Sequence, residues 1–297
     1  MKIFHVDAFT DTLFGGNAAG VALDAGHLAE QQMQQIAREL NLSETAFLLP
    51  SNNPDAHLRV RYFTPTSEID FCGHATIGLA WVLGTVEGWT ERVDRLVLET
   101  NIGLVPVDWQ LRDSQLEAVV MTQVSPQTKE IDVPAEEVAA LLGLAPTDLD
   151  DRYPIRLGNT GNWHLLVPVK NRTAIDRAVP DLSRLEALNR RQTAATTHLF
   201  TFESETEGLD LYTRDFAPAV GIPEDPVTGS ANGAMAGYLV LDGILSPDQT
   251  HRLRVGQGHT VGRPGQLLIT ITSSEQGPVV QVGGSAVISL EGVMRHL

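Results

Sequence analysis

The sequence predicts an α+β protein made of two similar domains, each with a mostly antiparallel, barrel-like sheet wrapped around one central helix. Two long stretches of the chain resemble one another, which indicates a duplicated domain. Much of the rest consists of short segments rich in Val, Leu and Phe and bounded by turn residues, as strands are. Two apolar runs rich in small residues, at 76–83 and 232–241, are the expected central helices, because small side chains let a helix be enclosed on every side.

The duplication shows in motifs that recur in the same order in both halves. Each copy has Arg-x-Phe-x-Pro, followed by Gly-(His/Ser)-Ala just before an apolar run. The matched segments are 16–17 with 161–162, 43–48 with 195–200, 61–65 with 214–218, 73–75 with 229–231, and 99–103 with 258–262. A repeat of this length implies two whole domains, expected at 1–123 and 124–297, with the C-terminal strand able to return to the first domain.

In the first half we expect strands and two helices. Short apolar segments predict strands at 4–9, 20–23, 45–49, 57–63, 96–100 and 117–122. A helix is expected over 28–40, where Met33, Ile36, Ala37 and Leu40 fall on one face at helical spacing. The central helix follows at 76–83. Residues 123–132, which include Pro126 and mixed polar residues, form the expected linker.

The second half is predicted to repeat this order with additional helices. Strands are expected at 155–157, 164–169, 197–202, 210–213, 267–271 and 279–282. A helix over 134–142 begins at a proline, carries two acidic residues in its first turn and ends before Gly143, which are typical start and stop signals. A further helix is expected at 182–188, and the central helix at 232–241.

Composition and charge limit the classes of function. At 297 residues, with 42% hydrophobic and 20% charged residues, the chain is long enough for two ordinary domains with apolar cores. Its formal charge of −16 argues against nucleic acid or an anionic membrane as a partner. The single cysteine, Cys72, excludes an intrachain disulfide and fits a reducing compartment. Residues 1–7 lack an apolar signal core, and the run 75–86 is shorter than the ~20 residues that span a bilayer, so we expect a cytoplasmic protein.

No motif in the sequence calls for a bound cofactor. The sequence lacks a dinucleotide-binding G-x-G-x-x-G after a strand, a Walker A lysine motif, H-E-x-x-H and paired C-x-x-C motifs. We therefore expect neither a metal nor a nucleotide, and the chemistry would fall to the side chains themselves.

The two Gly-(His/Ser)-Ala turns are the expected substrate-binding elements. Each lies at the start of an expected central helix, where free backbone N–H groups and the helix dipole attract anions. Gly73 and Ala75 would contribute from one copy, and Gly229 and Ser230 from the other, across a cleft between the domains. The predicted substrate is a small carboxylic acid.

Glu44 is the predicted proton carrier. It stands between an expected helix and an expected strand, and the second copy has Thr196 in its place, which cannot move protons near neutral pH. A proton-carrying group in one copy only is typical of an asymmetric active site, and desolvation at a cleft edge would suit a glutamate to general acid–base catalysis. The alternative is an ordinary surface glutamate.

His74 and Asp225 are the other predicted catalytic residues. The helix dipole disfavours a cationic His74 at a helix start, so we expect a neutral imidazole that hydrogen-bonds the substrate. Asp225 lies five residues before Ser230 and would face the cleft opposite Glu44 and His74. Two carboxylates from two domains suit the movement of a proton between carbons. The alternatives are a capping or core histidine and a turn aspartate.

Cys72 is expected to be a small buried residue and not a nucleophile. Racemases that work without a cofactor can use two thiols, one on each face of the α-carbon. The second copy has Thr228 at the equivalent position, so a two-thiol mechanism is excluded.

Together these motifs resemble the PhzF family, which comprises phenazine-biosynthesis-like proteins with the diaminopimelate epimerase fold. The resemblance covers essentially the whole chain, and its most specific segments are Gly16-Asn17-Ala18-Ala19-Gly20, Leu42-Ser43-Glu44-Thr45-Ala46, Cys72-Gly73-His74-Ala75-Thr76 and Glu224-Asp225-Pro226-Val227-Thr228-Gly229-Ser230. It implies isomerisation without a cofactor, with the family's acid/base glutamate at Glu44 and its accompanying polar residues at His74, Asp225 and Ser230. The related epimerases and racemases use paired cysteines, and this chain departs from them.

The predicted function is therefore a cofactor-independent isomerase of a small carboxylic acid, with proton transfer by Glu44 in an interdomain cleft. Two alternatives stay open. One is trans-2,3-dihydro-3-hydroxyanthranilate isomerase, an enzyme of phenazine biosynthesis, and the other is a non-catalytic small-acid-binding protein. A homodimer is a further expectation.

Overall fold

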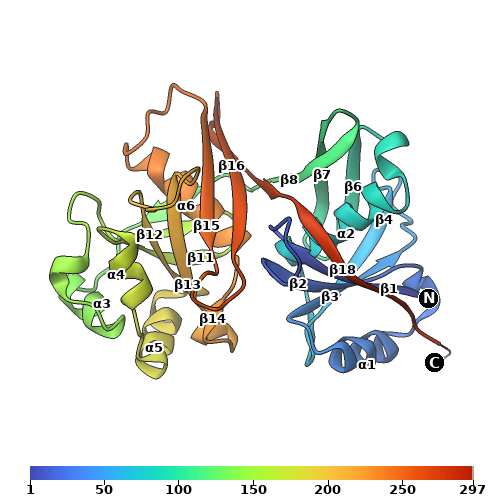
Figure 1. Ribbon diagram of the computed structural model, residues 1–297, viewed down its shortest axis with the longest axis horizontal. Helices are drawn as coiled ribbons and strands as arrows, with labels where there is room; N and C mark the ends of the chain where they lie inside the picture. Colours follow the sequence, from blue (N-terminus) through green and yellow to red (C-terminus); the bar gives the residue numbers. More distant parts are fainter. Residues whose placement is uncertain (296–297) are drawn as a thin grey trace. The chain divides into compact units, whose positions relative to one another are not determined.

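The computed structural model describes residues 1–295, which divide into two compact units (Figure 1). The first unit comprises Met1–Met121 and the C-terminal segment from Gly283, and the second comprises Thr122–Val282. Both units combine strands with helices, so the predicted α+β class is confirmed.

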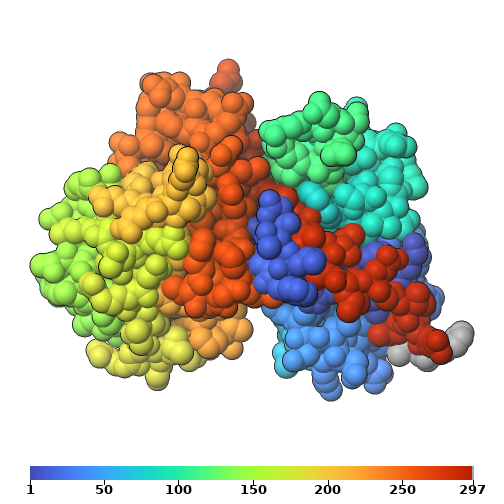
Figure 2. Space-filling model, in the orientation of Figure 1, coloured from blue at the N-terminus to red at the C-terminus, as the bar shows by residue number. Residues whose placement is uncertain are grey.

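Strands make up most of the first unit. Its elements are β1 (Lys2–Ala8), β2 (Asn17–Ala22), α1 (Glu30–Leu40), β3 (Glu44–Leu49), β4 (Leu58–Phe63), β5 (Glu68–Ile69), α2 (Gly73–Thr85), β6 (Arg95–Thr100), β7 (Gly103–Arg112), β8 (Gln115–Thr122) and β18 (Ala286–Val293). Strand β1 pairs with β2 on one side and with β18 on the other, both antiparallel. In space-filling form, the red C-terminal segment accordingly lies against the blue N-terminal part of this unit (Figure 2).

The remaining pairings of the first unit place Glu44 at a strand end. Strand β3 runs parallel to β2 and antiparallel to β4, and β4 in turn pairs with β5 and, in parallel, with β6. Strands β6, β7 and β8 form an antiparallel meander. Glu44 is the first residue of β3, opposite Ala19 of β2.

Helix α2 is the buried centre of the first unit. Its middle, from Ala75 to Leu83, is almost entirely buried, and Trp81 alone in that stretch is half-buried. Gly78 lets β1 approach closely, because a Cβ there would lie 3.4 Å from the Val6 side chain. The small residues noted in the sequence therefore act as packing surface, and Thr76, a polar residue in this core, is satisfied by the Cys72 carbonyl and the Tyr62 hydroxyl.

The second unit contains the matching elements. They are β9 (Gln127–Lys129), α3 (Ala135–Leu141), β10 (Arg156–Asn159), β11 (Trp163–Pro168), α4 (Arg172–Arg177), α5 (Leu182–Gln192), β12 (Thr196–Thr201), β13 (Leu211–Phe216), β14 (Glu224–Asp225), α6 (Gly229–Leu241), β15 (His251–Gln257), β16 (Gly265–Ser274) and β17 (Gly277–Gly284). Strand β11 runs parallel to β12, which pairs antiparallel with β13, and β13 pairs with β14 and, in parallel, with β15. This is the pairing order of β2 to β6, and helix α6, buried like α2, occupies the central position.

The strand registers test the proposed duplication residue by residue. Ala19 lies opposite Glu44 in the first unit, and His164 lies opposite Thr196 in the second, so Thr196 is the counterpart of Glu44 as predicted. The match of 99–103 with 258–262 is wrong by two residues, because Arg59 pairs with Glu99 whereas its counterpart Tyr212 pairs with Gly256. The connection from β15 to β16 is longer than the tight β6–β7 turn, so the glycines of this connection do not stand at positions equivalent to Gly103.

Several elements escaped the sequence analysis. Strands β7 and β15 were not predicted, and the expected linker 123–132 contains β9, which pairs with β10. No range was predicted for β18, but a C-terminal strand was expected to be able to return to the first domain, and β18 pairs with β1. In the first half of β15, two arginines occupy exposed positions and a histidine a partly exposed one, which hides the strand pattern. Helix α4 is short and depends on the Asn171 side chain, which caps it by accepting from the Ala174 backbone N–H.

Candidate functional site

Three predicted or considered residues, Glu44, Cys72 and His74, meet in the first unit. The chain leaves α1 through Asn41, whose positive φ of 52° ends the helix, and enters β3 at Glu44. Cys72 is the extended residue that precedes α2, and Gly73 begins the helix, as expected. Strand β3 and helix α2 therefore bring together side chains about thirty residues apart in the sequence.

Glu44 and His74 form a largely buried ion pair. The His74 Nε2 atom lies 3.2 Å from Glu44 Oε2, and the side chains are 11% and 19% exposed. Ser43 fixes a proton on Nε2: its hydroxyl donates to the Ala18 carbonyl, so at 3.3 Å from Nε2 it can only accept. Oε2 of Glu44 is buried and accepts no hydrogen bond from the described residues. An ionised oxygen with an open lone pair is what a general base needs.

The electrostatics of this pair correct one prediction. Burial opposes ionisation of Glu44, but the direct contact with His74 and its charge outweigh burial and lower the Glu44 pKa below its usual 4.5. Burial would likewise lower the pKa of His74, but Cys72 and Glu44 raise it well above 6.5. This direction goes against the expectation of a neutral imidazole, because a carboxylate in direct contact opposes the helix dipole and favours the cationic form of His74.

Cys72 is a protonated thiol in contact with the His74 ring. Burial, and then the charge of Glu44, raise its pKa, which agrees with the prediction that it is not a nucleophile. The donor atoms of Cys72, His74 and Glu44 lie within 4.8 Å of one another and have the composition of a metal site. However, Sγ lies 3.5 Å from Nδ1 and 3.9 Å from Nε2, beside the ring and off both in-plane lone-pair directions. A zinc ion about 2.0 Å from a ring nitrogen could not also reach this sulfur at about 2.3 Å without rearrangement.

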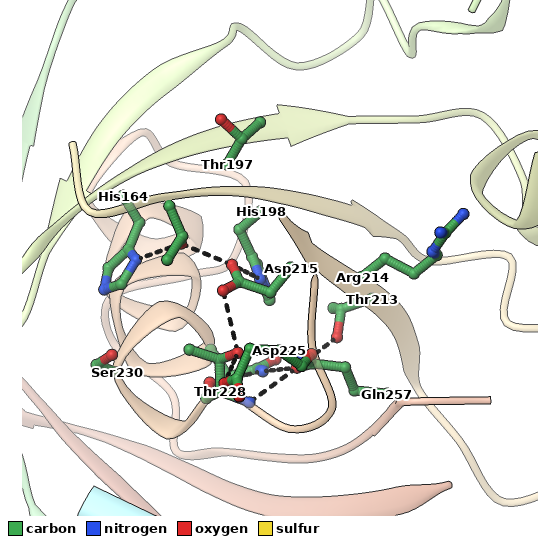
Figure 3. Close-up of polar contacts among 12 residues, drawn as sticks. His164, Thr197, His198, Thr213, Arg214, Asp215, Asp225, Thr228, Ser230 and Gln257 are labelled. Carbon is green, nitrogen blue, oxygen red and sulfur yellow. Dashed lines mark hydrogen bonds and ion pairs between the residues drawn. The ribbon is translucent and has the colours of Figure 1, made fainter. Parts of the chain in front are cut away.

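A second polar cluster lies at the start of α6 in the second unit. Asp225 of β14 pairs with Asp215 of β13, and Thr228 directly precedes α6. The Thr228 hydroxyl lies 2.6 Å from Asp225 Oδ2 and 3.1 Å from Asp215 Oδ2. Figure 3 shows this chain of contacts continuing from Asp215 to His198 and toward His164.

The predicted binding residues of the second copy also lie at this helix start. Gly229 is the first residue of α6, as Gly73 is of α2, and Ser230 follows it. The Ser230 carbonyl accepts from the Thr160 hydroxyl, and the Ser230 side chain stands apart from the Asp215 contacts (Figure 3). Because Asp225 and Ser230 belong to the second unit, their approach to Glu44 and His74 stays a prediction.

Sequence reasoning missed Ser43, Asp215 and Gln257 as site residues. Asp215 carried a signal that could have been used, since it is a charged residue in the strand Leu211–Phe216, every residue of which is buried. Ser43 and Gln257 carried none, because their roles depend on which hydrogen-bond partners the fold brings to them.

Comparison with known proteins points to one family. The family described as phenazine biosynthesis-like protein (PhzC-PhzF) matches residues 6–292. The chain is 37% identical to the uncharacterized isomerase YddE of Escherichia coli K12, over 97% of this chain and 96% of that protein. It is 33% identical to trans-2,3-dihydro-3-hydroxyanthranilate isomerase of Pseudomonas aeruginosa, again over 97% and 96%.

Solved structures agree with the sequence relatives. A PhzF-family phenazine biosynthesis protein of Bacillus anthracis matches with a TM-score of 0.90 and 34% identity, over 99% of both chains. A hydroxyproline epimerase of Agrobacterium vitis, 15% identical, matches with a TM-score of 0.64 over 98% of this chain and 90% of that one, which confirms the predicted epimerase-like fold. Within residues 1–295, the helices are too short or too polar to cross a membrane.

Proposed function

Because the chain belongs to the PhzC-PhzF family of phenazine biosynthesis-like proteins and is an isomerase, we propose that it moves a proton on a small carboxylic acid through Glu44, without a cofactor. The observation that carries this proposal is the buried Oε2 of Glu44, which is ionised beside His74 and accepts no hydrogen bond from residues 1–295.

The Glu44–His74 pair suits proton abstraction from carbon. An ionised Glu44 can accept the proton, and the Glu44 carboxyl that results can return it to another carbon. The negative charge left on the substrate would be stabilised by the cationic imidazole of His74 and by the N-terminus of α2, which begins one residue before it. The base and the stabilising charge are thus adjacent in one unit.

The helix starts are the proposed carboxylate-binding elements. The first N–H groups of a helix lack intrahelical partners and point outward, so the amides around Gly73 and Ala75 of α2, and around Gly229 and Ser230 of α6, are suited to anions. We propose Asp225 as the second proton-transferring carboxyl. The cytoplasmic location and the homodimer remain predictions.

The named relatives provide one specific candidate substrate. The relative from P. aeruginosa acts, by its name, on trans-2,3-dihydro-3-hydroxyanthranilate, a small carboxylic acid. At 33% identity this acid is the first substrate to test, alongside other small carboxylates.

Solvent deuterium incorporation tests the proposal. The protein is incubated in D₂O with trans-2,3-dihydro-3-hydroxyanthranilate and with a panel of small carboxylic acids, and carbon-bound deuterium is measured by mass spectrometry and NMR. An isomerase that uses general base catalysis incorporates deuterium at carbon. Acids that bind, as shown by calorimetry, without any incorporation would favour the non-catalytic binding protein instead.

A further inference from the structure

We propose that the loop over residues 9–15 of the first unit determines substrate specificity. Its exposed side chains Leu13 and Phe14 would bind the apolar body of the carboxylic acid whose proton Glu44 moves. This role rests on the proposed function and deepens it, because it names the substrate class, an acid with a hydrocarbon body, and the residues that select it.

The loop is present in only one copy of the duplication. Residues 9–16 connect β1 with β2, whereas residues 160–162 connect the corresponding strands β10 and β11. The strand registers place Asp7 and Asn159 at equivalent positions near the ends of β1 and β10. Residues 9–15 therefore have no counterpart within residues 122–282. The insertion belongs to the copy that carries the proposed base.

The insertion leads directly into the strand end that holds Glu44. Strands β2 and β3 are parallel neighbours, so their first residues, Asn17 and Glu44, lie at the same end of the sheet. The Ser43 hydroxyl donates to the Ala18 carbonyl at 3.1 Å, which joins the two strand ends. Phe14 precedes Asn17 by three residues, which span at most about 11 Å. The loop tip is thus close enough to contact the far end of a small acid held at Glu44.

Two large apolar side chains are adjacent at this loop tip. Leu13 is 48% exposed and Phe14 is 67% exposed. A single exposed apolar side chain is ordinary, but two neighbours on an inserted loop form an apolar surface that a ligand can cover. The shorter connection of the second unit has Gly161 and Asn162 instead, so it offers no such surface.

The backbone holds Phe14 in an unfavourable conformation. Its φ of 68° lies in the left-handed region, which a bulky residue rarely adopts. Its N–H donates to Oδ2 of Asp7, a fully buried residue, at 3.0 Å. Glycine would fit this backbone without strain. Strained residues are concentrated at ligand-binding and active sites, so the ring at this position points to a function outside folding.

Both ends of the loop are fixed, so the ring is presented on a rigid support. Phe9 is fully buried, and its N–H donates to the Ser285 carbonyl at 2.8 Å. Gly16, with a φ of 55°, passes so close to Ala8 that a Cβ would lie 2.0 Å from the Ala8 carbonyl oxygen. A preformed apolar contact binds a ligand without the entropy cost of ordering the loop.

The chemistry of the loop tip defines the substrate class. In the proposed function, helix N-termini and His74 bind the charge of the substrate. The side chains of Leu13 and Phe14 have no hydrogen-bonding group, so a polar substrate atom against them would lose water without gaining a partner. A hydrocarbon body loses nothing there and gains the large contact area of the aromatic ring. We therefore expect acids with hydrocarbon bodies to bind more tightly than equally large acids with polar ones.

Calorimetry on the full-length protein with two matched acids tests this role. Cyclohexanecarboxylate and tetrahydropyran-4-carboxylate share a shape and differ by one CH₂ group against one ether oxygen. The wild type should bind the first about fivefold more tightly. Phe14→Gly should weaken that binding about tenfold and remove the preference, as loss of an apolar contact does. Its stability in urea should be unchanged or higher, because glycine suits the backbone. Phe14→Leu should keep most of the affinity.

Leu111→Ala is the matched control. Leu111 is 52% exposed and lies opposite Leu116, whose side chain packs beside Gly84 at the end of α2 far from His74. This variant should leave both affinities unchanged.

Three results would overturn the specificity role. They are a wild type that binds both acids equally or fails to bind cyclohexanecarboxylate, a Phe14→Gly protein that keeps the preference, and a Phe14→Gly protein that is destabilised. The deuterium assay judges the proposed function separately. Deuterium incorporation into any acid upholds that function even if the loop shows no preference, and a loop preference without any incorporation upholds binding alone.

Discussion

At the scale of single residues, the two units have chemically different side chains at equivalent positions of the same strand arrangement. Glu44 and Thr196 occupy matching strand ends, and Tyr62 stands where the second unit has Asp215. The first unit therefore has a carboxylate paired with a cationic histidine, and the second has two carboxyls bridged by a hydroxyl.

Replacement of Glu44 tests its role as proton carrier. Glu44→Gln keeps the volume but cannot accept a proton, so turnover should fall by at least ~10²-fold, the lower end for loss of general acid–base catalysis. Substrate binding should change much less, because the amides of α2 remain. The measurement is steady-state kinetics on whichever acid shows deuterium incorporation.

Cys72→Ser is the comparison for this variant. It should cost far less activity, because Cys72 is a protonated thiol and the second unit has no thiol to complete a two-thiol mechanism. An inactive Cys72→Ser protein beside an active Glu44→Gln protein would refute the assignment of Glu44.

The Glu44–His74 pair should also make stability depend on pH. The pKa of Glu44 is lowered in the folded state, so its contribution to the free energy of unfolding is complete above 4.5 and is lost as pH falls through the folded value. The pKa of His74 is raised, so its contribution is complete below 6.5 and is lost as pH rises through the folded value. Both contributions are complete between 4.5 and 6.5.

Urea unfolding across this range checks the expectation. Glu44→Gln should lower the free energy of unfolding most within the window and less on either side of it. Glu39→Gln, at an exposed glutamate of α1, is the control. A destabilisation by Glu44→Gln that stays constant with pH would show that the ion pair is not its cause.

The candidate site could be predicted from the sequence only in part. Glu44 and His74 were identified from the duplication and the family motifs, and their contact is confirmed. The protonation state of His74 could not be predicted, because it depends on a carboxylate thirty residues away in the chain. The same holds for Asp215, Thr228 and Gln257, whose significance lies in distances of 2.6–3.1 Å that only the folded chain sets.

At the scale of elements, the two central helices differ in how closely their neighbours approach a glycine of the helix. Gly237 of α6 lies against Pro126, and a Cβ at that position would be 2.2 Å from the Pro126 Cβ. Gly78 of α2 leaves 3.4 Å to Val6, an ordinary contact. Glycine in a helix is otherwise unfavourable, so these two positions respond to alanine in opposite directions.

This pair of substitutions gives an internal comparison. Gly237→Ala should lower the free energy of unfolding by about 1–3 kcal/mol, the usual cost of overpacking. Gly78→Ala should raise it by about 0.5–1 kcal/mol, because alanine leaves the unfolded chain fewer conformations than glycine does and is more favourable within a helix. Chemical denaturation of both variants checks this, and equal effects of one sign would show that the close contact with Pro126 is relieved by backbone movement.

Element type was more predictable than element extent. The sequence gives clear signals for the central helices and for helix α3. One of them is Gly143 just past the end of α3, which has a φ of +68° in the structure. Strand β15 was hidden by its charged side chains, and β9 by its place in a polar, proline-containing segment. These strands form because neighbours far along the chain pair with them, which a local pattern does not reveal.

At the scale of the whole molecule, the charge is strongly acidic, with 37 acidic and 21 basic residues. The carboxylic acid that we propose as substrate would therefore approach a repulsive field, and groups that act locally, such as helix N-termini and His74, would have to bind it. Long-range repulsion is screened by salt, whereas contacts in a buried site are screened much less.

The rate of substrate capture should accordingly rise with salt. Between about 0.01 M and 0.15 M salt the Debye length falls from about 30 Å to about 8 Å, so kcat/KM for a carboxylate should rise about threefold or more while kcat changes little. Steady-state kinetics at the two ionic strengths tests this, with sucrose in place of salt as the control. A fall in kcat/KM with salt would indicate that local positive charge dominates the approach.

The pairing of β1 with β18 has a consequence for how the chain is made. The second unit is one continuous stretch, whereas the first needs both its opening residues and the strand that ends at Val293. During synthesis, residues 122–282 can fold as soon as they leave the ribosome, while β1 keeps one edge unpaired until the residues of β18 have been added. The first unit thus stays incomplete until β18 has been made, with an open strand edge that a chaperone or a neighbouring nascent chain could occupy.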